Sequence, residues 1–242
     1  MSTKIYKLGF YLKYFVDKCN LTYDVNKFQI YSGNTLDQIL KIFADERVPA
    51  SISQILQIRY DLINENSSIR DFYLDNYFDS SDFVLHNNGN IKIVYTIDND
   101  GNITKKGKKL LDIINSNLFR KDKILILDDF YKLLEGEEFS EEYLRKSSEG
   151  LSIKRVKTDK VWRVLARDQA ILNECADLIF NEYKIRFGKL TPLNSLRLMK
   201  VDYARNKSQI NLCCIRDLMH WCDVSISGSF CSNNSRFIGI SL

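Results

Sequence analysis

Proline and glycine are scarce in this chain of 242 residues, which has 2 prolines and 10 glycines. Long proline-rich or glycine-rich linkers are therefore not expected. No stretch approaches the roughly 18 apolar residues that a membrane-spanning helix needs. The opening Met1-Ser2-Thr3-Lys4 is followed by no apolar signal core. We expect a cytoplasmic protein, or one injected into a cytoplasm, with reduced thiols and no membrane partner.

Histidine is rare as well, since His86 and His220 are the only two in the chain. A histidine general base therefore has few candidates, and no Cys-His or Ser-His-Asp arrangement is evident along the sequence. Because no clear catalytic motif is present, we expect a protein without catalysis and without a cofactor, with Mg²⁺ as the alternative.

Five potential zinc ligands gather within 19 residues near the C-terminus: Cys213, Cys214, His220, Cys222 and Cys231. Structural zinc sites usually pair ligands two to four residues apart, whereas Cys213 and Cys214 are adjacent. Cysteine is also a common small core residue. We interpret these thiols as core residues and keep zinc as the alternative.

The longest helical pattern runs from about Val161 to Phe187. Its buried face repeats every seven residues, at Leu165, Leu172 and Ile179. Gly188 is expected to end the helix, because glycine tolerates the left-handed conformation found there. Thr191-Pro192 resembles an N-cap with proline at the first helical position, so a second helix is expected to follow.

Charge is distributed unevenly along the chain. Residues 1–150 carry 20 Lys/Arg and 23 Asp/Glu, a net −3, whereas residues 151–242 carry 15 and 8, a net +7. A basic half suggests a polyanionic partner, or an electrostatic match between the two halves. Six candidate phosphate contacts are Lys154, Arg155, Lys157, Lys160, Arg163 and Arg167. Lys160, Arg163 and Arg167 are expected on one outer helix face. Four lysines are expected to extend this surface: Lys105, Lys106, Lys108 and Lys109.

The overall pattern predicts a helix-dominated α+β fold. It consists of an N-terminal helical lobe, a central β-hairpin, and a basic C-terminal helical lobe with terminal strands. The expected divisions are 1–118 (helical lobe with the hairpin), 119–150 (a connecting strand and an acidic helix) and 151–242 (the basic lobe). Expected helices include 35–45, 49–62, 69–78, 105–115 and 135–149. Expected strands include 28–31, 91–97, 102–104, 123–127, 224–227 and 236–240.

The segment 91–115 invites a comparison with a known family. Its Ile103-Thr104-x-x-Gly107-x-x-Leu110-Leu111 pattern is similar to the end of the wing in winged-helix DNA-binding domains. That resemblance implies DNA binding through a recognition helix just upstream. The nearest upstream helix carries Asp71, Asp75 and Asp79, which phosphate would repel. A plain β-hairpin packed on a helix is the favoured interpretation.

The centre of the chain contains one candidate phosphate-binding loop and one candidate metal site. Gly101-x5-Gly107-Lys108-Lys109 departs from a phosphate-binding P-loop, which has four intervening residues and a hydroxyl after the lysine. Asp128 and Asp129 follow an apolar run and could hold Mg²⁺, as a nuclease requires. The chain's one Glu-x-Lys, Glu182-Tyr183-Lys184, lies in the long helix rather than beside them. A helix cap is favoured for Asp128.

The sequence thus predicts a non-catalytic protein that binds nucleic acid or a nucleoprotein complex, and a phage or plasmid is the expected origin. One alternative is a Mg²⁺-dependent nuclease that uses Asp128 and Asp129. The other is a protein-only inhibitor or adaptor of a host complex. The acidic segment 135–149 distinguishes these cases, because it could mask the basic surface and leave the protein to bind proteins.

Overall fold

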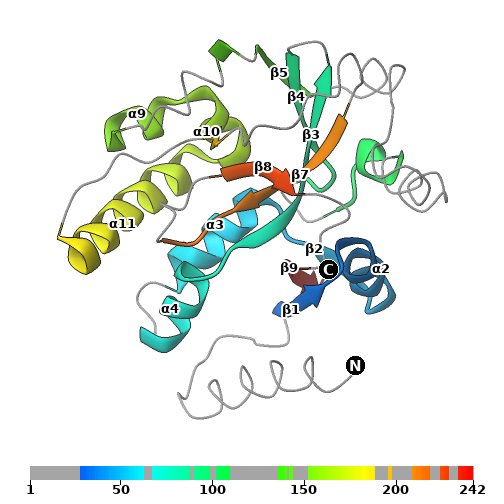
Figure 1. Ribbon diagram of the computed structural model, residues 1–242, viewed down its shortest axis with the longest axis horizontal. Helices are drawn as coiled ribbons and strands as arrows, with labels where there is room; N and C mark the ends of the chain where they lie inside the picture. Colours follow the sequence, from blue (N-terminus) through cyan, green and yellow to red (C-terminus); the bar gives the residue numbers. More distant parts are fainter. Residues whose placement is uncertain are drawn as a thin grey trace.

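A nine-stranded mixed β-sheet organises the molecule (Figure 1). The structure is a computed structural model that describes residues 28–62, 67–87, 90–98, 102–109, 136–140, 142–143, 152–188, 196–197, 209–218, 224–228 and 234–241. The strands are β1 (Phe28–Gly33), β2 (Arg47–Pro49), β3 (Phe78–Asn87), β4 (Asn90–Tyr95), β5 (Glu137–Ser140), β6 (Leu196–Arg197), β7 (Gln209–Ile215), β8 (Val224–Gly228) and β9 (Ser235–Ser241).

The main path of the sheet runs β1-β9-β3-β7-β8-β6. Strand β2 pairs with β9, β4 pairs with β3, and β5 pairs with β4. Strands β1 and β9 are antiparallel neighbours, with Phe28 opposite Ile240 and Gly33 opposite Ser235. Strands β3 and β9 are parallel where they meet, as are β6 and β8. The sheet therefore draws strands from each of the three expected divisions of the chain.

Helices cover the sheet from several parts of the chain. They are α2 (Thr35–Ala44), α3 (Ile52–Asp61), α4 (Ser67–Leu74), α9 (Ile153–Thr158), α10 (Lys160–Ala166) and α11 (Gln169–Phe187). Helix α11 packs against α3, α9 and α10, and α10 also contacts α3. Figure 1 shows this group on one side of β3 and β7, whereas α2 lies beside β1, β2 and β9. One core cluster joins the α11 group to the strands, with fully buried side chains such as Ile55, Phe78, Ile93 and Leu165.

The expectation of a helix-dominated fold is wrong, because a large sheet rather than a helical lobe forms the centre. Strand β3, whose start was expected to be helical, pairs with β4, β7 and β9. Residues 137–140 were expected in an acidic helix and form β5, and residues 196–197 form β6 instead of part of a second helix. Strand β4 lies between β3 and β5 in this sheet and is antiparallel to both.

Several local predictions are confirmed. Helix α2 begins at Thr35, although its N-cap is Asn34, whose side chain accepts bonds from the amides of Leu36 and Asp37. Helix α3 has a capping box formed by Ser51 and Gln54. The expected start of this helix at Pro49 is wrong, because Pro49 is the last residue of β2. Strands 224–228 and 235–241 match the expected terminal strands. Gly188 ends α11 with a φ of 66°.

The long helix expected from Val161 to Phe187 is divided in two. Arg167 adopts a left-handed conformation with a φ of 59° and ends α10. Asp168 then caps α11, and its carboxylate accepts bonds from the amides of Ala170 at 2.7 Å and Ile171 at 3.1 Å. An aspartate at this position favours a new helix start because it satisfies amides that a first turn leaves without partners. The break turns Arg167 away from the direction that a continuous helix would give it.

The Thr104-x-x-Gly107 pattern has a packing role in this structure. Thr104 donates a hydrogen bond to the Tyr95 carbonyl at 2.9 Å, and its oxygen accepts one from the Gly107 amide at 2.9 Å. A Cβ atom added to Gly107 would lie 2.1 Å from the Thr96 carbonyl oxygen. Residues 105–109 are helical and follow this close contact directly. Glycine is therefore required here by the approach of two backbone segments.

We expect Gly107→Ala to destabilise the protein by about 1–3 kcal/mol, because a methyl group must displace backbone atoms. This cost exceeds the roughly 1 kcal/mol that alanine gains over glycine within a helix. Urea unfolding measures the change. Lys108→Ala at the exposed neighbouring position is the control, with an expected change within about 0.5 kcal/mol. Equal stability of the two variants would contradict the close contact.

Candidate functional site: the groove between β5 and α10

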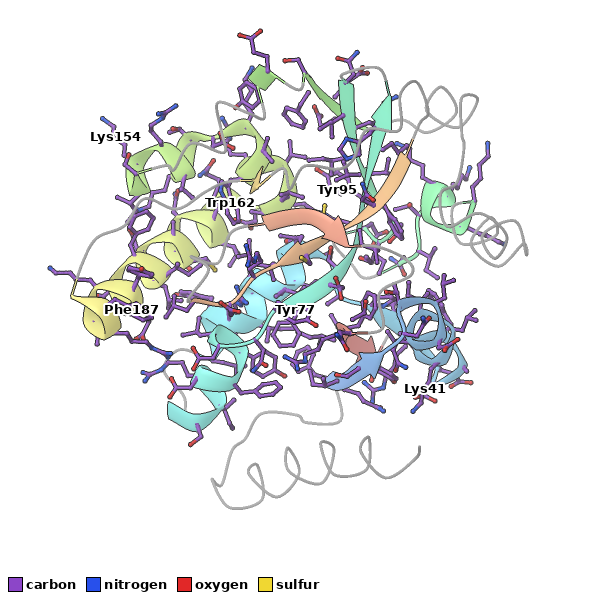
Figure 2. All side chains as sticks on the ribbon, viewed as in Figure 1. Lys41, Tyr77, Tyr95, Lys154, Trp162 and Phe187 are labelled. Atoms are coloured by element: carbon purple, nitrogen blue, oxygen red, sulfur yellow. The ribbon has the colours of Figure 1, made fainter. Side chains whose placement is uncertain are left out.

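The six basic residues expected to contact phosphate are in different environments. Lys154 and Arg155 are exposed on α9, and Figure 2 shows Lys154 at the rim of the molecule. Lys157 forms an ion pair with Asp177 of α11 at 2.6 Å. Lys160 and Arg163 are exposed on α10. The prediction that Lys160, Arg163 and Arg167 share one outer helix face is wrong for Arg167, whose side chain is buried against Asp82 of the sheet.

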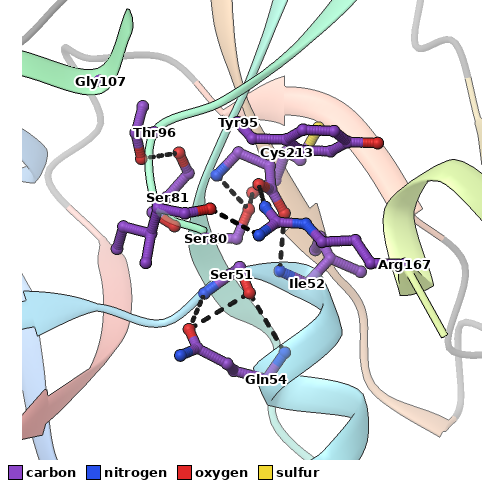
Figure 3. Close-up of polar contacts among 12 residues, drawn as sticks. Ser51, Ile52, Gln54, Ser80, Ser81, Tyr95, Thr96, Gly107, Arg167 and Cys213 are labelled. Atoms are coloured by element: carbon purple, nitrogen blue, oxygen red, sulfur yellow. Dashed lines mark hydrogen bonds and ion pairs between the residues drawn. The ribbon is translucent and has the colours of Figure 1, made fainter. Parts of the chain in front are cut away.

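Arg167 faces the sheet, and its side chain is 8% exposed. Its guanidinium forms an ion pair with Asp82 of β3 and donates a hydrogen bond to the Ile97 carbonyl at 2.6 Å. The guanidinium carbon also lies 4.1 Å from the centre of the Tyr95 ring, a cation–π geometry visible in Figure 3. The break between α10 and α11 directs this side chain inward. Arg167 thus joins the helical layer to the sheet.

Asp82 is the buried partner in this network, with a fully buried side chain. Its second carboxylate oxygen accepts a hydrogen bond from the Ile52 amide at 2.8 Å, at the start of α3 (Figure 3). Burial raises the pKa of Asp82, and the Arg167 guanidinium and the Ile52 amide offset part of that rise. Burial also raises the pKa of Tyr95, with a contribution from the nearby Asp82 carboxylate. One carboxylate therefore joins β3, α3 and the α10–α11 break.

A groove of about 720 Å³ lies between β5 and α10. Its volume is within the range of ligand sites in proteins, about 300–1,000 Å³. Residues from both elements and from the turns beside them line it: Glu137, Glu138, Phe139, Ser140, Tyr143, Lys160, Arg163, Val164, Arg167 and Gln169. The groove therefore contains three of the expected phosphate contacts and part of the acidic segment.

Two tyrosines fix α10 relative to the strands of this groove. The Tyr143 hydroxyl accepts a hydrogen bond from the Lys160 amide at 3.2 Å, at the start of α10, and its ring stacks on Phe139 of β5. The Tyr95 hydroxyl donates to the Val164 carbonyl at 2.7 Å, near the end of α10. Arg167 adds the attachment to β3. The two walls are thus held by contacts at both ends of the helix, as a preorganised site requires.

The two walls carry opposite charges. Glu137 and Glu138 are exposed on β5, and Lys160 and Arg163 are exposed on α10. Sequence reasoning identified the basic wall and the acidic segment separately. It missed Phe139, Tyr143 and Tyr95, because the tertiary pairing of β5 with β4 gives these aromatic residues their place. The alternation of Glu138, Phe139 and Ser140 was the available signal for a strand.

The remaining predicted site residues lie elsewhere or outside the described residues. Lys105, Lys108 and Lys109 are exposed on the helical turn 105–109, which Figure 1 places across β3 and β4 from α9. Lys106 in the same turn is half-buried. Asp128 and Asp129 fall outside the described residues, so the Mg²⁺ nuclease alternative stays a prediction.

Cys213 and Cys214 are buried in β7 and are not joined in a disulfide, and burial raises the pKa of Cys213. The other zinc candidates, His220, Cys222 and Cys231, lie outside the described residues. Among the residues that are described, no three His, Cys, Asp or Glu side chains are grouped to hold a metal ion.

The part of the chain that the structure describes also contains no helix that is long and apolar enough to cross a membrane.

No protein-family model matches the chain, and no curated protein matches it in sequence. It is similar to a solved structure described as "Accommodation of massive sequence variation in Nanoarchaeota by the C-type lectin fold", with a TM-score of 0.57 and 12% sequence identity. The similarity covers 88% of this chain and 96% of that chain. At this identity the likeness concerns the fold alone. A C-type lectin fold is not helix-dominated, which agrees with the correction above.

Proposed function

We propose that this protein is a non-catalytic binding protein and that the groove between β5 and α10 receives a segment of another polypeptide. The observation that carries this proposal is the opposition of Glu137 and Glu138 on one wall to Lys160 and Arg163 on the other. A polypeptide can present both signs of charge along its length, and complementary charges favour a specific partner and register. Phosphates of a nucleic acid would approach the basic wall only against repulsion from the two carboxylates.

The similar solved structure is described as accommodating massive sequence variation in the C-type lectin fold. A scaffold that accommodates varied residues suits recognition, because binding surfaces can change while the supporting sheet is kept. We take this as support for a binding role in this chain. We also propose that the partner polypeptide is part of a host complex or of a nucleoprotein complex.

Nucleic-acid binding is the second candidate, favoured by the exposure of four basic residues. Lys154 and Arg155 on α9 and Lys160 and Arg163 on α10 lie close together in sequence and on adjoining helices. Only the last two line the groove. Nucleic-acid binding would therefore involve the basic residues of α9, whereas polypeptide binding in the groove would not.

The test compares two charge-reversed pairs, Lys160→Glu/Arg163→Glu in the groove and Lys154→Glu/Arg155→Glu on α9 as the matched control. Linear peptides selected from a random display library are measured by fluorescence anisotropy, and single- and double-stranded oligonucleotides by gel shift over a salt series. We expect peptide affinity to fall at least tenfold for the groove pair, as loss of about 1.4 kcal/mol implies, and to be unchanged for the α9 pair.

Failure to select any peptide, or equal effects of the two pairs on peptide affinity, would contradict the polypeptide proposal. Oligonucleotide binding that both pairs weaken, with a flatter dependence on salt, would support the second candidate instead. Glu137→Gln/Glu138→Gln adds a sign test. Removal of the acidic wall raises oligonucleotide affinity if the carboxylates oppose phosphate, and it does not raise the affinity of peptides that use this wall.

A further inference from the structure

Four consecutive residues of β5, Glu137 to Ser140, line the groove. Side chains of a strand alternate between its two faces, so a groove on one face would be lined by every second residue. Here Glu137 and Phe139 belong to one face, and Glu138 and Ser140 to the other. The groove therefore runs along the edge of the strand, where backbone groups as well as side chains are accessible.

The edge in question is the one that faces away from β4. Strand β5 pairs antiparallel with β4, with Glu137 opposite Ile93 and Ser140 opposite Asn90. Within the described ranges, β4 is the sole strand that pairs with β5. In an antiparallel strand, alternate residues direct their N–H and C=O groups to opposite sides. Half of the backbone groups of β5 therefore point toward the side away from β4.

We propose that an extended peptide segment binds in the groove as an additional antiparallel or parallel strand on the outer edge of β5. The proposal rests on the function proposed above and specifies how the polypeptide is held. Main-chain hydrogen bonds to β5 provide affinity, and the side-chain positions of the groove provide selectivity, as in other cases of strand addition. The four residues of β5 span roughly 13 Å, so about four residues of the partner pair with it.

Charge complementarity defines the chemistry of this segment. Lys160 and Arg163 are exposed on the wall opposite β5, so an acidic side chain on the partner strand that points toward α10 is favoured. Glu137 and Glu138 favour a basic side chain near β5. Phe139 is 8% exposed and stacks on Tyr143, so the apolar floor beneath the partner strand is already formed. The favoured ligand is an extended segment that carries both a carboxylate and a cation.

A helix or a nucleic acid would use the groove differently. A helical ligand satisfies its own main-chain groups, so it gains nothing from the backbone of β5. A nucleic acid offers phosphates and bases, and it meets the carboxylates of β5 first. Strand addition therefore makes a distinct prediction: the binding affinity depends on the backbone amide of every second residue of the ligand.

The test uses a peptide selected on the intact protein and a series of its analogues in which one amide at a time is replaced by an ester. Each ester removes a single N–H donor with little change in shape. We expect affinity to fall about fivefold at alternate positions, since a hydrogen bond contributes about 1 kcal/mol, and to change little at the positions between them. In parallel, hydrogen exchange of alternate β5 amides is expected to slow when the peptide is added.

Uniform tolerance of the ester replacements, or a dependence on positions three and four residues apart, would overturn strand addition. A peptide that still loses affinity with Lys160→Glu/Arg163→Glu would then leave the polypeptide-binding function standing. If no peptide is selected at all, the proposed function fails before the ester series begins. The two failures are therefore separate results.

Discussion

Arg167→Ala is expected to lower the free energy of unfolding by about 3–5 kcal/mol, because it leaves the buried Asp82 carboxylate without its charged partner. The Arg167 side chain also donates to the Ile97 carbonyl, so its loss leaves a second polar group without this donor. Equilibrium unfolding in urea measures the change. The matched control is Lys157→Ala, which breaks an ion pair with Asp177 at the surface and is expected to cost about 0–1 kcal/mol.

The coupling between the two buried charges is measured with Asp82→Asn and the double variant Arg167→Ala/Asp82→Asn. Asparagine keeps an oxygen that can accept from the Ile52 amide but removes the negative charge. The double variant removes both charges and is expected to be more stable than the sum of the single changes predicts. Additive effects, or a loss for Arg167→Ala no larger than that for Lys157→Ala, would show that this pair does not hold the helices to the sheet.

Arg59→Met is expected to destabilise the protein by at least about 3 kcal/mol, since it leaves three carbonyl groups without their donor, each at a cost of about 1–3 kcal/mol. Arg59 is 1% exposed and donates to the carbonyls of Tyr73, Asn76 and Arg216 at 3.0–3.1 Å. These carbonyls belong to α4, to the residues before β3, and to the residue that follows β7. Methionine preserves much of the side-chain length, so the loss reports on the hydrogen bonds.

Arg155→Met makes the same chemical change at an exposed position of α9 and serves as the control, with an expected change within about 0.5 kcal/mol. Thermal and urea unfolding of both variants provide the comparison. A stability of Arg59→Met close to that of Arg155→Met would contradict the role of this guanidinium as a buried link between three segments.

Strand β3 explains why the sheet was underestimated from sequence. Its first half, Asp79-Ser80-Ser81-Asp82, is polar, although all four residues are buried. A polar run of this kind lacks the alternating or continuous apolar pattern by which strands are recognised. The partners that make its burial possible are distant in sequence: Asp79 accepts from the Arg236 amide, Ser80 donates to the Cys213 carbonyl, and Asp82 pairs with Arg167. Local sequence contains none of this information.

Helices and caps were easier to predict, because their signals are local. The start near Thr35 and the end at Gly188 follow from residues within one turn, whereas α3 begins at Ile52 rather than at the expected Pro49. The break at Arg167 was missed because Leu165 and Leu172 are both buried, so the seven-residue repeat continues across it. Asp168 was its one local signal, as an N-cap residue inside an apolar pattern.

The groove was half predictable. Lys160 and Arg163 stand out as charged positions on an apolar helical pattern, and Glu137 and Glu138 as part of an acidic run. Their meeting across one groove depends on the pairing of β5 with β4 and on the contacts of Tyr95 and Tyr143 with α10. Those contacts join segments separated by 17 and 69 residues, beyond the reach of periodicity.

The central claim is that the groove between β5 and α10 is the binding site of this protein. Backbone amide NMR spectra of the intact protein, recorded with and without a selected peptide, test it most directly. We expect the largest shift changes on residues 137–140, Tyr143, Lys160 and Arg163, with small changes on Lys154 and Arg155. Largest changes on α9, or on the exposed Ile185 and Phe187 at the end of α11, with β5 unaffected, would contradict it.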